Sequence, residues 1–141
     1  MNWKNLAFGA VAFAVIAEIA HVVEAMLTMN YYLDPAYFGT WSKIMMPAAG
    51  APPAEFYMYS IVFALVTGAL FAYVYSVVRG ALPKKNTGIW YGKLVWLVAG
   101  FPGSLSMYLM FNMPVGLIAA WTVSSLIIYV AAGWALEKIA G

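Results

Sequence analysis

Leu6–Met29 reads LAFGAVAFAVIAEIAHVVEAMLTM, an almost unbroken apolar run. A helix needs about 20 mostly apolar residues to cross a hydrocarbon core of about 30 Å, and this run is long enough. Three further runs of sufficient length follow, at Phe56–Val78, Ile89–Phe111 and Pro114–Leu136. None alternates with the period of two that a transmembrane β-barrel requires. The sequence therefore predicts an all-α integral membrane protein, a bundle of four transmembrane helices forming one domain over residues 1–141.

The composition agrees with this class. The chain is 65% hydrophobic and only 9% charged, and its mean hydropathy is +0.85. A soluble domain of this length could not bury so much apolar side chain, so we expect the lipid bilayer to surround the protein. The chain has no cysteine, which excludes thiol–disulfide exchange and metal binding by thiolates.

Basic residues predict the orientation of the chain in the membrane. If the first helix leaves the cytoplasm, only Lys43 of the 7 basic residues falls outside. Cytoplasmic loops carry an excess of Lys and Arg, so we expect a multi-pass protein whose N- and C-termini are both cytoplasmic. The cluster between Arg79 and Lys85 could contact lipid headgroups or nucleic acid. The positive-inside rule already explains it, and we expect no nucleic-acid partner.

The predicted first loop, Asn30–Glu55, is unusually long. Connections between bundle helices typically have about 2 to 8 residues, and longer loops are often functional. Pro35 can open a short helix that carries residues up to Met46 and is ended by Pro47. Because this segment is rich in aromatic residues, we expect it to lie in the outer interface or to form a lid.

Two features predict how the helices pack. Small residues recur every four positions along the second predicted helix, at Ser60, Ala64, Gly68, Ala72 and Ser76. Rows of this kind promote helix association in membranes, and the associating helix could belong to the same chain, to a second copy in a homo-oligomer, or to a partner membrane subunit. In the third helix, Phe101-Pro102-Gly103 predicts a kink and a polar notch near the middle of the membrane.

Ionisable residues interrupt the first helix. Glu18, His21 and Glu24 are spaced i, i+3, i+6 and share a sector of about 120° on its surface. A charged side chain near the bilayer centre costs about 2.5 to 3.5 kcal/mol on insertion scales, so such residues usually face a bundle interior or a wet cavity. We therefore predict an outer-half ligand pocket. Its candidate ligand-binding residues are Glu18, His21, Glu24, Tyr57, Tyr108 and Asn112.

The first chemical interpretation is a metal site. Glu-x-x-His is the pair that di-iron bundles contribute from one helix, but those bundles need further ligands from other helices. Only a symmetric dimer would double the set here, because the chain has 1 His. A single Zn, Mn or Fe ion held by Glu18, His21, Glu24 and water is the simpler form of this hypothesis, with a divalent metal ion as the cofactor.

The second interpretation is binding or proton-coupled transport of a cation or a protonatable solute, with Glu18 exchanging a proton for the cation. The run Ala14–Ile19 is similar to the glutamate-bearing first helix of small multidrug resistance transporters, which also have four helices and work as dimers. The likeness covers about one and a half helical turns. The long first loop, His21, Glu24 and Pro102 depart from that family, and the chain is not assigned to it.

The third interpretation is a non-catalytic accessory or scaffold subunit of a larger membrane complex, in which the polar groups satisfy one another. Intramembrane hydrogen bonds contribute only about 0.6 kcal/mol on average, which argues against a purely structural network. Enzyme activity has little support, since the sequence contains no nucleophile elbow, phosphate-binding loop or zinc-protease motif.

Overall fold

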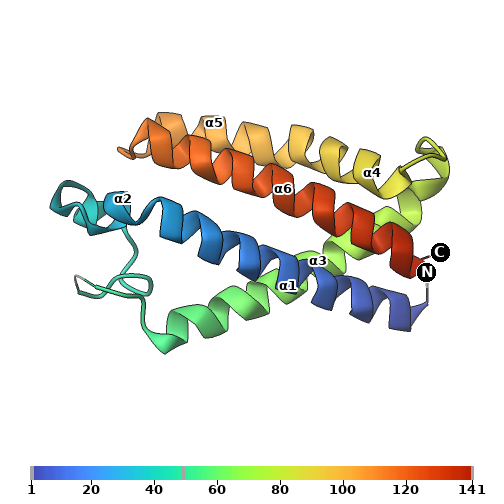
Figure 1. Ribbon diagram of the computed structural model, residues 1–141, viewed down its shortest axis with the longest axis horizontal. Helices are drawn as coiled ribbons and strands as arrows, with labels where there is room; N and C mark the ends of the chain where they lie inside the picture. The colour runs from blue at the N-terminus through green and yellow to red at the C-terminus, as the bar shows by residue number, and fades with distance from the viewer. Residues whose placement is uncertain (1, 49, 141) are drawn as a thin grey trace.

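The computed structural model describes residues 2–48 and 50–140. In this part of the chain, 4 helical segments are long and apolar enough to cross a membrane. These are α1 (Trp3–Leu27), α3 (Ala54–Val78, continued by the 3-10 turn η2, Arg79–Ala81), a composite third segment, and α6 (Val115–Ala140). They run side by side, and the two termini lie at one end of the bundle (Figure 1). The predicted four-helix membrane class is confirmed.

The third segment consists of three pieces in line. α4 (Thr87–Val95) passes into a π-helical turn, η3 (Trp96–Gly100), and then into α5 (Phe101–Met110). The N–H of Phe101 donates to the carbonyl of Trp96, five residues earlier. The interruption that Pro102 predicts therefore takes the form of a single π turn, a rare feature that is often found at functional sites.

α1 and α3 approach each other closely where both carry small residues. A Cβ atom on Gly68 would lie 2.7 Å from the carbonyl oxygen of Ala10 and 2.7 Å from Cβ of Phe13. Ala72 is fully buried, and a Cβ atom on Gly9 would meet its methyl group at 2.9 Å. The small-residue stripe of α3 thus has a partner within the same chain along this part of its length.

α4 and α6 are held even more tightly, by glycines on both helices. A side chain on Gly88 would collide with the backbone carbonyl of Gly133, and one on Gly133 would collide with the carbonyl of Gly88. Gly92 lies in the same way against the carbonyl of Tyr129. At the start of α4, the N–H of Gly88 donates to Glu137 Oε2 at 3.0 Å, so a carboxyl oxygen of α6 caps one of the free donors of α4.

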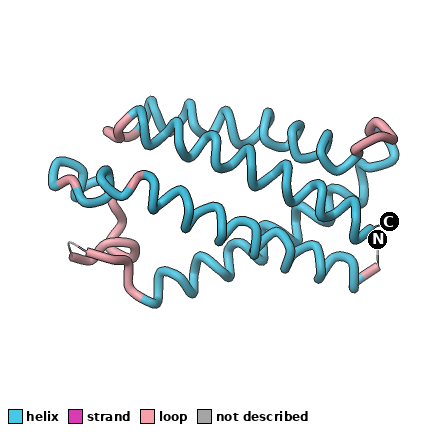
Figure 2. Tube along the Cα trace, viewed as in Figure 1, coloured by secondary structure: helices cyan, strands magenta, loops and turns pink. Residues whose placement is uncertain are grey.

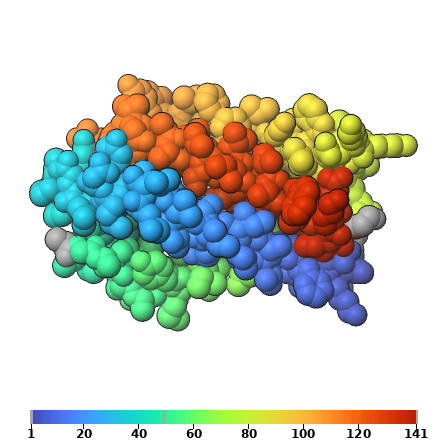
Figure 3. Space-filling model, in the orientation of Figure 1, coloured from blue at the N-terminus to red at the C-terminus, as the bar shows by residue number. Residues whose placement is uncertain are grey.

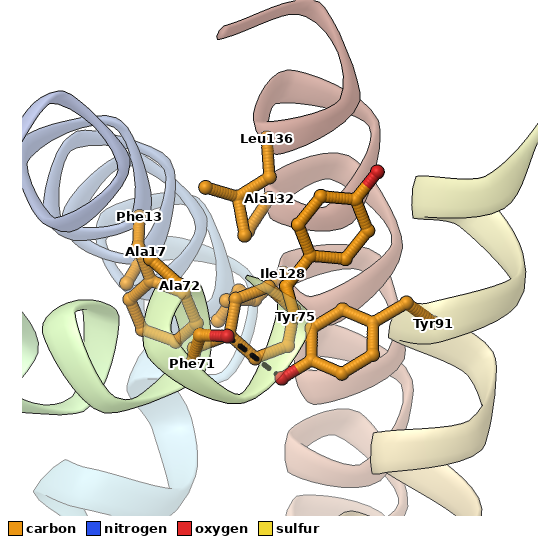
Figure 4. Packing of buried hydrophobic residues seen from close by; sticks show 9 residues of the cluster. All are labelled: Phe13, Ala17, Phe71, Ala72, Tyr75, Tyr91, Ile128, Ala132 and Leu136. Carbon is orange, nitrogen blue, oxygen red and sulfur yellow. Dashed lines mark hydrogen bonds between the residues drawn. The ribbon is translucent and has the colours of Figure 1, made fainter. Parts of the chain in front are cut away.

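An aromatic core joins the four segments (Figure 4). The rings of Phe71 and Tyr91 lie 4.5 Å apart between centroids, and those of Phe13 and Phe71 lie 5.3 Å apart. The Tyr91 hydroxyl donates to the carbonyl of Phe71 at 2.7 Å, drawn as the dashed line in Figure 4. This bond fastens α4 to α3.

The first loop differs from the prediction. It contains α2 (Met29–Leu33) and a 3-10 helix, η1 (Pro35–Thr40), among the irregular segments of Figure 2. Helical structure does begin at Pro35, where the Asp34 side chain accepts from the N–H of Ala36 at 2.9 Å. It ends at Thr40, so the predicted helix reaching Met46 is not confirmed. The reason is Trp41, whose backbone is extended (φ −78°, ψ 142°).

The ring of Trp41 anchors this loop to the bundle. It is buried and packs 5.0 Å from the ring of Tyr32 and 6.4 Å from that of Trp121. The indole N–H of Trp121 also donates to the Tyr32 hydroxyl at 2.9 Å. Three aromatic side chains therefore fix the loop onto the N-terminal part of α6.

Candidate functional site

The site is centred on Glu18, in the middle of α1. Its Oε1 atom accepts a hydrogen bond from the Ser60 hydroxyl of α3 at 2.7 Å. Glu18 is half-buried. On the side of Glu18 that faces the chain termini, α1 and α3 are in contact at Gly68. Toward the first loop the ribbons of the two helices separate (Figure 1). Glu18 and Ser60 thus lie on the first-loop side of the contact at Gly68.

A cavity of about 730 Å³ occupies this region, between α1, α3, α6 and the first loop. Ligand pockets commonly measure about 300 to 1,000 Å³, so its size suits a small organic molecule. Its aromatic lining consists of Phe13, Phe56, Tyr59, Phe63 and Tyr129. Its polar lining consists of Glu18, His21, Ser42, Ser60, Thr67 and Ser125.

The charge in this cavity comes from one helix. Glu18 and His21 lie one turn apart on α1, and both line the cavity. His21 is exposed, whereas Glu18 is half-buried. None of the described residues that line the cavity is lysine or arginine. Among the described lining residues, His21 is therefore the one basic side chain that accompanies the carboxyl group of Glu18.

Trp96 is hydrogen-bonded to Ser125 of the cavity lining, and it is not among the residues predicted from the sequence. Its indole N–H is shared between the carbonyl of Thr122 at 3.1 Å and the hydroxyl of Ser125 at 3.1 Å. The Ser125 hydroxyl itself donates to the carbonyl of Thr122 at 2.8 Å. Tryptophan in membrane proteins is enriched at the interfaces. Trp96 lies inside a predicted span instead, and this unusual position could have marked it as a residue with a polar partner.

Glu24 lies apart from the other two members of the stripe. It is buried, and its Oε1 accepts from the hydroxyl of Thr28 at 2.7 Å. It lines a second cavity, between α1 and α6. Outside the span, burial raises the pKa of the nearby Tyr32 hydroxyl, and the charge of Glu24 raises it further. The structure therefore brings Glu18 and His21 together and directs Glu24 elsewhere.

The remaining candidate residues lie on the surface. Tyr57, Tyr108 and Asn112 are all exposed, and they are absent from the lining of both cavities. Within residues 2–48 and 50–140, no group of three His, Asp or Glu side chains is placed to hold a metal ion. Ligand binding by these three residues stays a prediction, as does the metal site of Glu18, His21 and Glu24.

Comparisons of the chain with protein-family models, with curated proteins and with solved structures find no match. The class is accordingly defined by the fold: residues 2–48 and 50–140 form 4 helices long and apolar enough to cross a membrane, which is compatible with a small multi-pass membrane protein. The site adds a half-buried carboxyl group in a cavity rich in aromatic rings.

Proposed function

We propose that the cavity around Glu18 binds an organic cation or a protonatable amine of moderate size. The observation that carries this proposal is the combination of one carboxyl group with five aromatic side chains, in a lining that contains no lysine or arginine among the described residues. An ionised group removed from water needs a partner of opposite charge, and Glu18 provides it.

The aromatic rings favour the same class of ligand. A cation over the face of an aromatic ring gains about 0.5 to 2 kcal/mol, more when the site excludes water. Phe13, Phe63 and Tyr129 approach the cavity from three different helices. A rounded ammonium group could therefore contact rings on several sides while its charge faces Glu18.

The geometry also supports a direction of access. Ser42 and Ile44 of the first loop line the cavity, whereas the contact of Gly68 with Ala10 and Phe13 closes the space between α1 and α3 on the other side of Glu18. With cytoplasmic termini, as the basic residues predict, the cavity would be reached from the outside. Transport of the bound solute would require α1 and α3 to separate at this contact.

A matched pair of ligands tests the proposal. Benzyltrimethylammonium and its neutral carbon analogue neopentylbenzene have the same shape and differ in charge. Equilibrium dialysis against the detergent-solubilised protein should show binding of the cation and at least about tenfold weaker binding of the analogue, the effect of about 1.4 kcal/mol. Glu18→Gln should remove this preference. Glu55→Gln is the control, because Glu55 is exposed in the first turn of α3 and outside the cavity.

Equal binding of the two ligands, or an unchanged preference in Glu18→Gln, would overturn the proposal. The metal hypothesis has its own test, namely the metal content of the purified protein by mass spectrometry. A near-stoichiometric metal that is lost in both His21→Ala and Glu18→Gln would replace the organic cation with an ion. Copurification of a membrane protein, without binding of either ligand, would favour the accessory subunit.

A further inference from the structure

The second cavity lies between α1 and α6, which are neighbours on the face drawn in Figure 3. Its volume is about 670 Å³, again within the range of ligand pockets, about 300 to 1,000 Å³. Nine of its twelve lining residues are apolar. The small side chains of Ala20, Ala119 and Ala120 contribute to the lining and leave room between the two helices. This cavity is distinct from the one around Glu18.

Three buried polar side chains line this otherwise apolar space: Glu24, Thr28 and Ser124, which are 8%, 6% and 8% exposed. Thr28 donates to Glu24 Oε1 at 2.7 Å. Ser124 Oγ has no hydrogen-bond partner within the described residues. A buried hydroxyl without a partner is unfavourable, so a ligand that pairs with it would remove this cost.

The polar and apolar parts of the cavity are separated along α1. Glu24 and Thr28 lie toward the first loop, whereas Ile16 and Ile19 line the deeper part. The rise of a helix places Ile16 about 12 Å from Glu24 along the axis. The cavity is therefore amphipathic, with its polar end nearer the end of the span and its apolar end nearer the middle.

We propose that this cavity binds a single-chain amphiphile whose head group donates a hydrogen bond to Glu24 and pairs with Ser124. Its hydrocarbon tail lies along Ala20 and Ile19 toward Ile16. A head group with a hydroxyl or an ammonium can donate a hydrogen bond to the carboxyl oxygens of Glu24. The twofold match, of head group to polar end and of tail to apolar end, distinguishes this ligand from a purely apolar one.

Native mass spectrometry of the full chain, released from detergent micelles, tests this site with three probes of equal chain length. 1-Monoolein presents hydroxyls, oleylamine presents an ammonium, and methyl oleate presents no donor. We expect 1-monoolein or oleylamine to be retained at least about tenfold more than methyl oleate. Which of the two is retained identifies the source of the donor.

Three variants locate the bound amphiphile. Ala120→Phe fills the groove and should abolish retention, while Ser124→Ala and Glu24→Gln change the polar end and should each weaken it severalfold. If Ala120→Phe does not fold, Ser124→Ala carries the test, because it only removes a hydroxyl. Glu18→Gln is the matched control and should retain the amphiphile fully, which separates this site from the one proposed above.

Three results would overturn the inference. One is retention of methyl oleate equal to that of the two donors. Another is retention that is unchanged in Ala120→Phe and Ser124→Ala. The third is a dimer that dissociates in Ala120→Phe while no probe is retained, which would assign the groove to a second copy of the chain.

Discussion

The hydroxyl of Ser60 donates to Glu18 Oε1 over 2.7 Å and is the polar link between α3 and α1 at the cavity. The two helices otherwise meet through small and apolar residues such as Gly68 and Ala10. The link therefore contributes to stability and also sets the position of the carboxyl group that the proposed cation would contact.

The first prediction concerns this pair. Ser60→Ala should lower the free energy of unfolding by only about 0.6 kcal/mol, the average for hydrogen bonds between membrane helices. A double-mutant cycle with Glu18→Gln, followed by denaturant unfolding in micelles, measures the coupling. Ser76→Ala on the same helix is the control, because its hydroxyl bonds only to the carbonyl of Tyr73. Strictly additive effects of the Ser60 and Glu18 changes would contradict the link.

The second prediction concerns the contact of α4 with α6. Gly88→Ala and Gly133→Ala should each lower the free energy of unfolding by about 1 to 3 kcal/mol, because the new methyl group meets a backbone carbonyl that cannot move aside easily. Gly103→Ala is the matched control, since a Cβ atom there meets nothing within 4 Å. Thermal unfolding followed by circular dichroism measures all three. Equal stability of the three variants would refute the close contact.

The third prediction concerns Trp96. Trp96→Phe keeps most of the ring but removes the N–H that binds Ser125 and the carbonyl of Thr122. We expect a loss of about 0.5 to 1.5 kcal/mol in stability together with weaker binding of benzyltrimethylammonium, because Ser125 is freed in the cavity lining. Trp90→Phe is the control, since Trp90 is exposed and does not line the cavity. An unchanged affinity in Trp96→Phe would show that Ser125 needs no such support.

The fourth prediction concerns pH. Burial raises the pKa of Tyr32 above its ordinary value of 10.0. The folded state therefore favours the neutral phenol, and this contribution to stability is complete below pH 10 and is lost as the pH rises through the folded pKa. The ultraviolet difference spectrum between wild type and Tyr32→Phe should show tyrosinate appearing above pH 10. In Trp121→Phe the midpoint should rise further, because the indole N–H favours the ionised form. A midpoint at or below 10 would contradict the burial.

The spans could be predicted because length and hydropathy alone determine them. The predicted Phe56–Val78 lies within α3, which begins two residues earlier at Ala54. The glycines of α4 and α6 carry no hydropathy signal, and Gly133 lies 45 positions after Gly88 and 41 after Gly92 in the sequence. The contact between these glycines depends on which helices pack against each other, and this cannot be derived from a single sequence.

The candidate site was predicted in part. Spacing placed Glu18, His21 and Glu24 on one sector of α1, but that sector is about 120° wide. Two different helices face its edges: α3 beside Glu18 and α6 beside Glu24. On α3, Tyr59 lines the cavity and Tyr57 does not, a difference of helix rotation that composition cannot reveal. The cytoplasmic location of the termini stays a prediction.

The glycine contact between α4 and α6 has a consequence for biosynthesis. Helices enter the membrane in chain order, and α1 and α3 can pair at Gly68 as soon as the second span is made. Gly88 and Gly92 of the third span pack against the backbone of α6, so this contact cannot form until α6 has also been inserted. The packing of the third span is thus completed only after α6, which follows it in the chain, has entered the membrane. A chain truncated before Val115 would keep the bond of Tyr91 to α3 but would leave Gly88 and Gly92 without their packing surface, and membrane quality control could then recognise the third span.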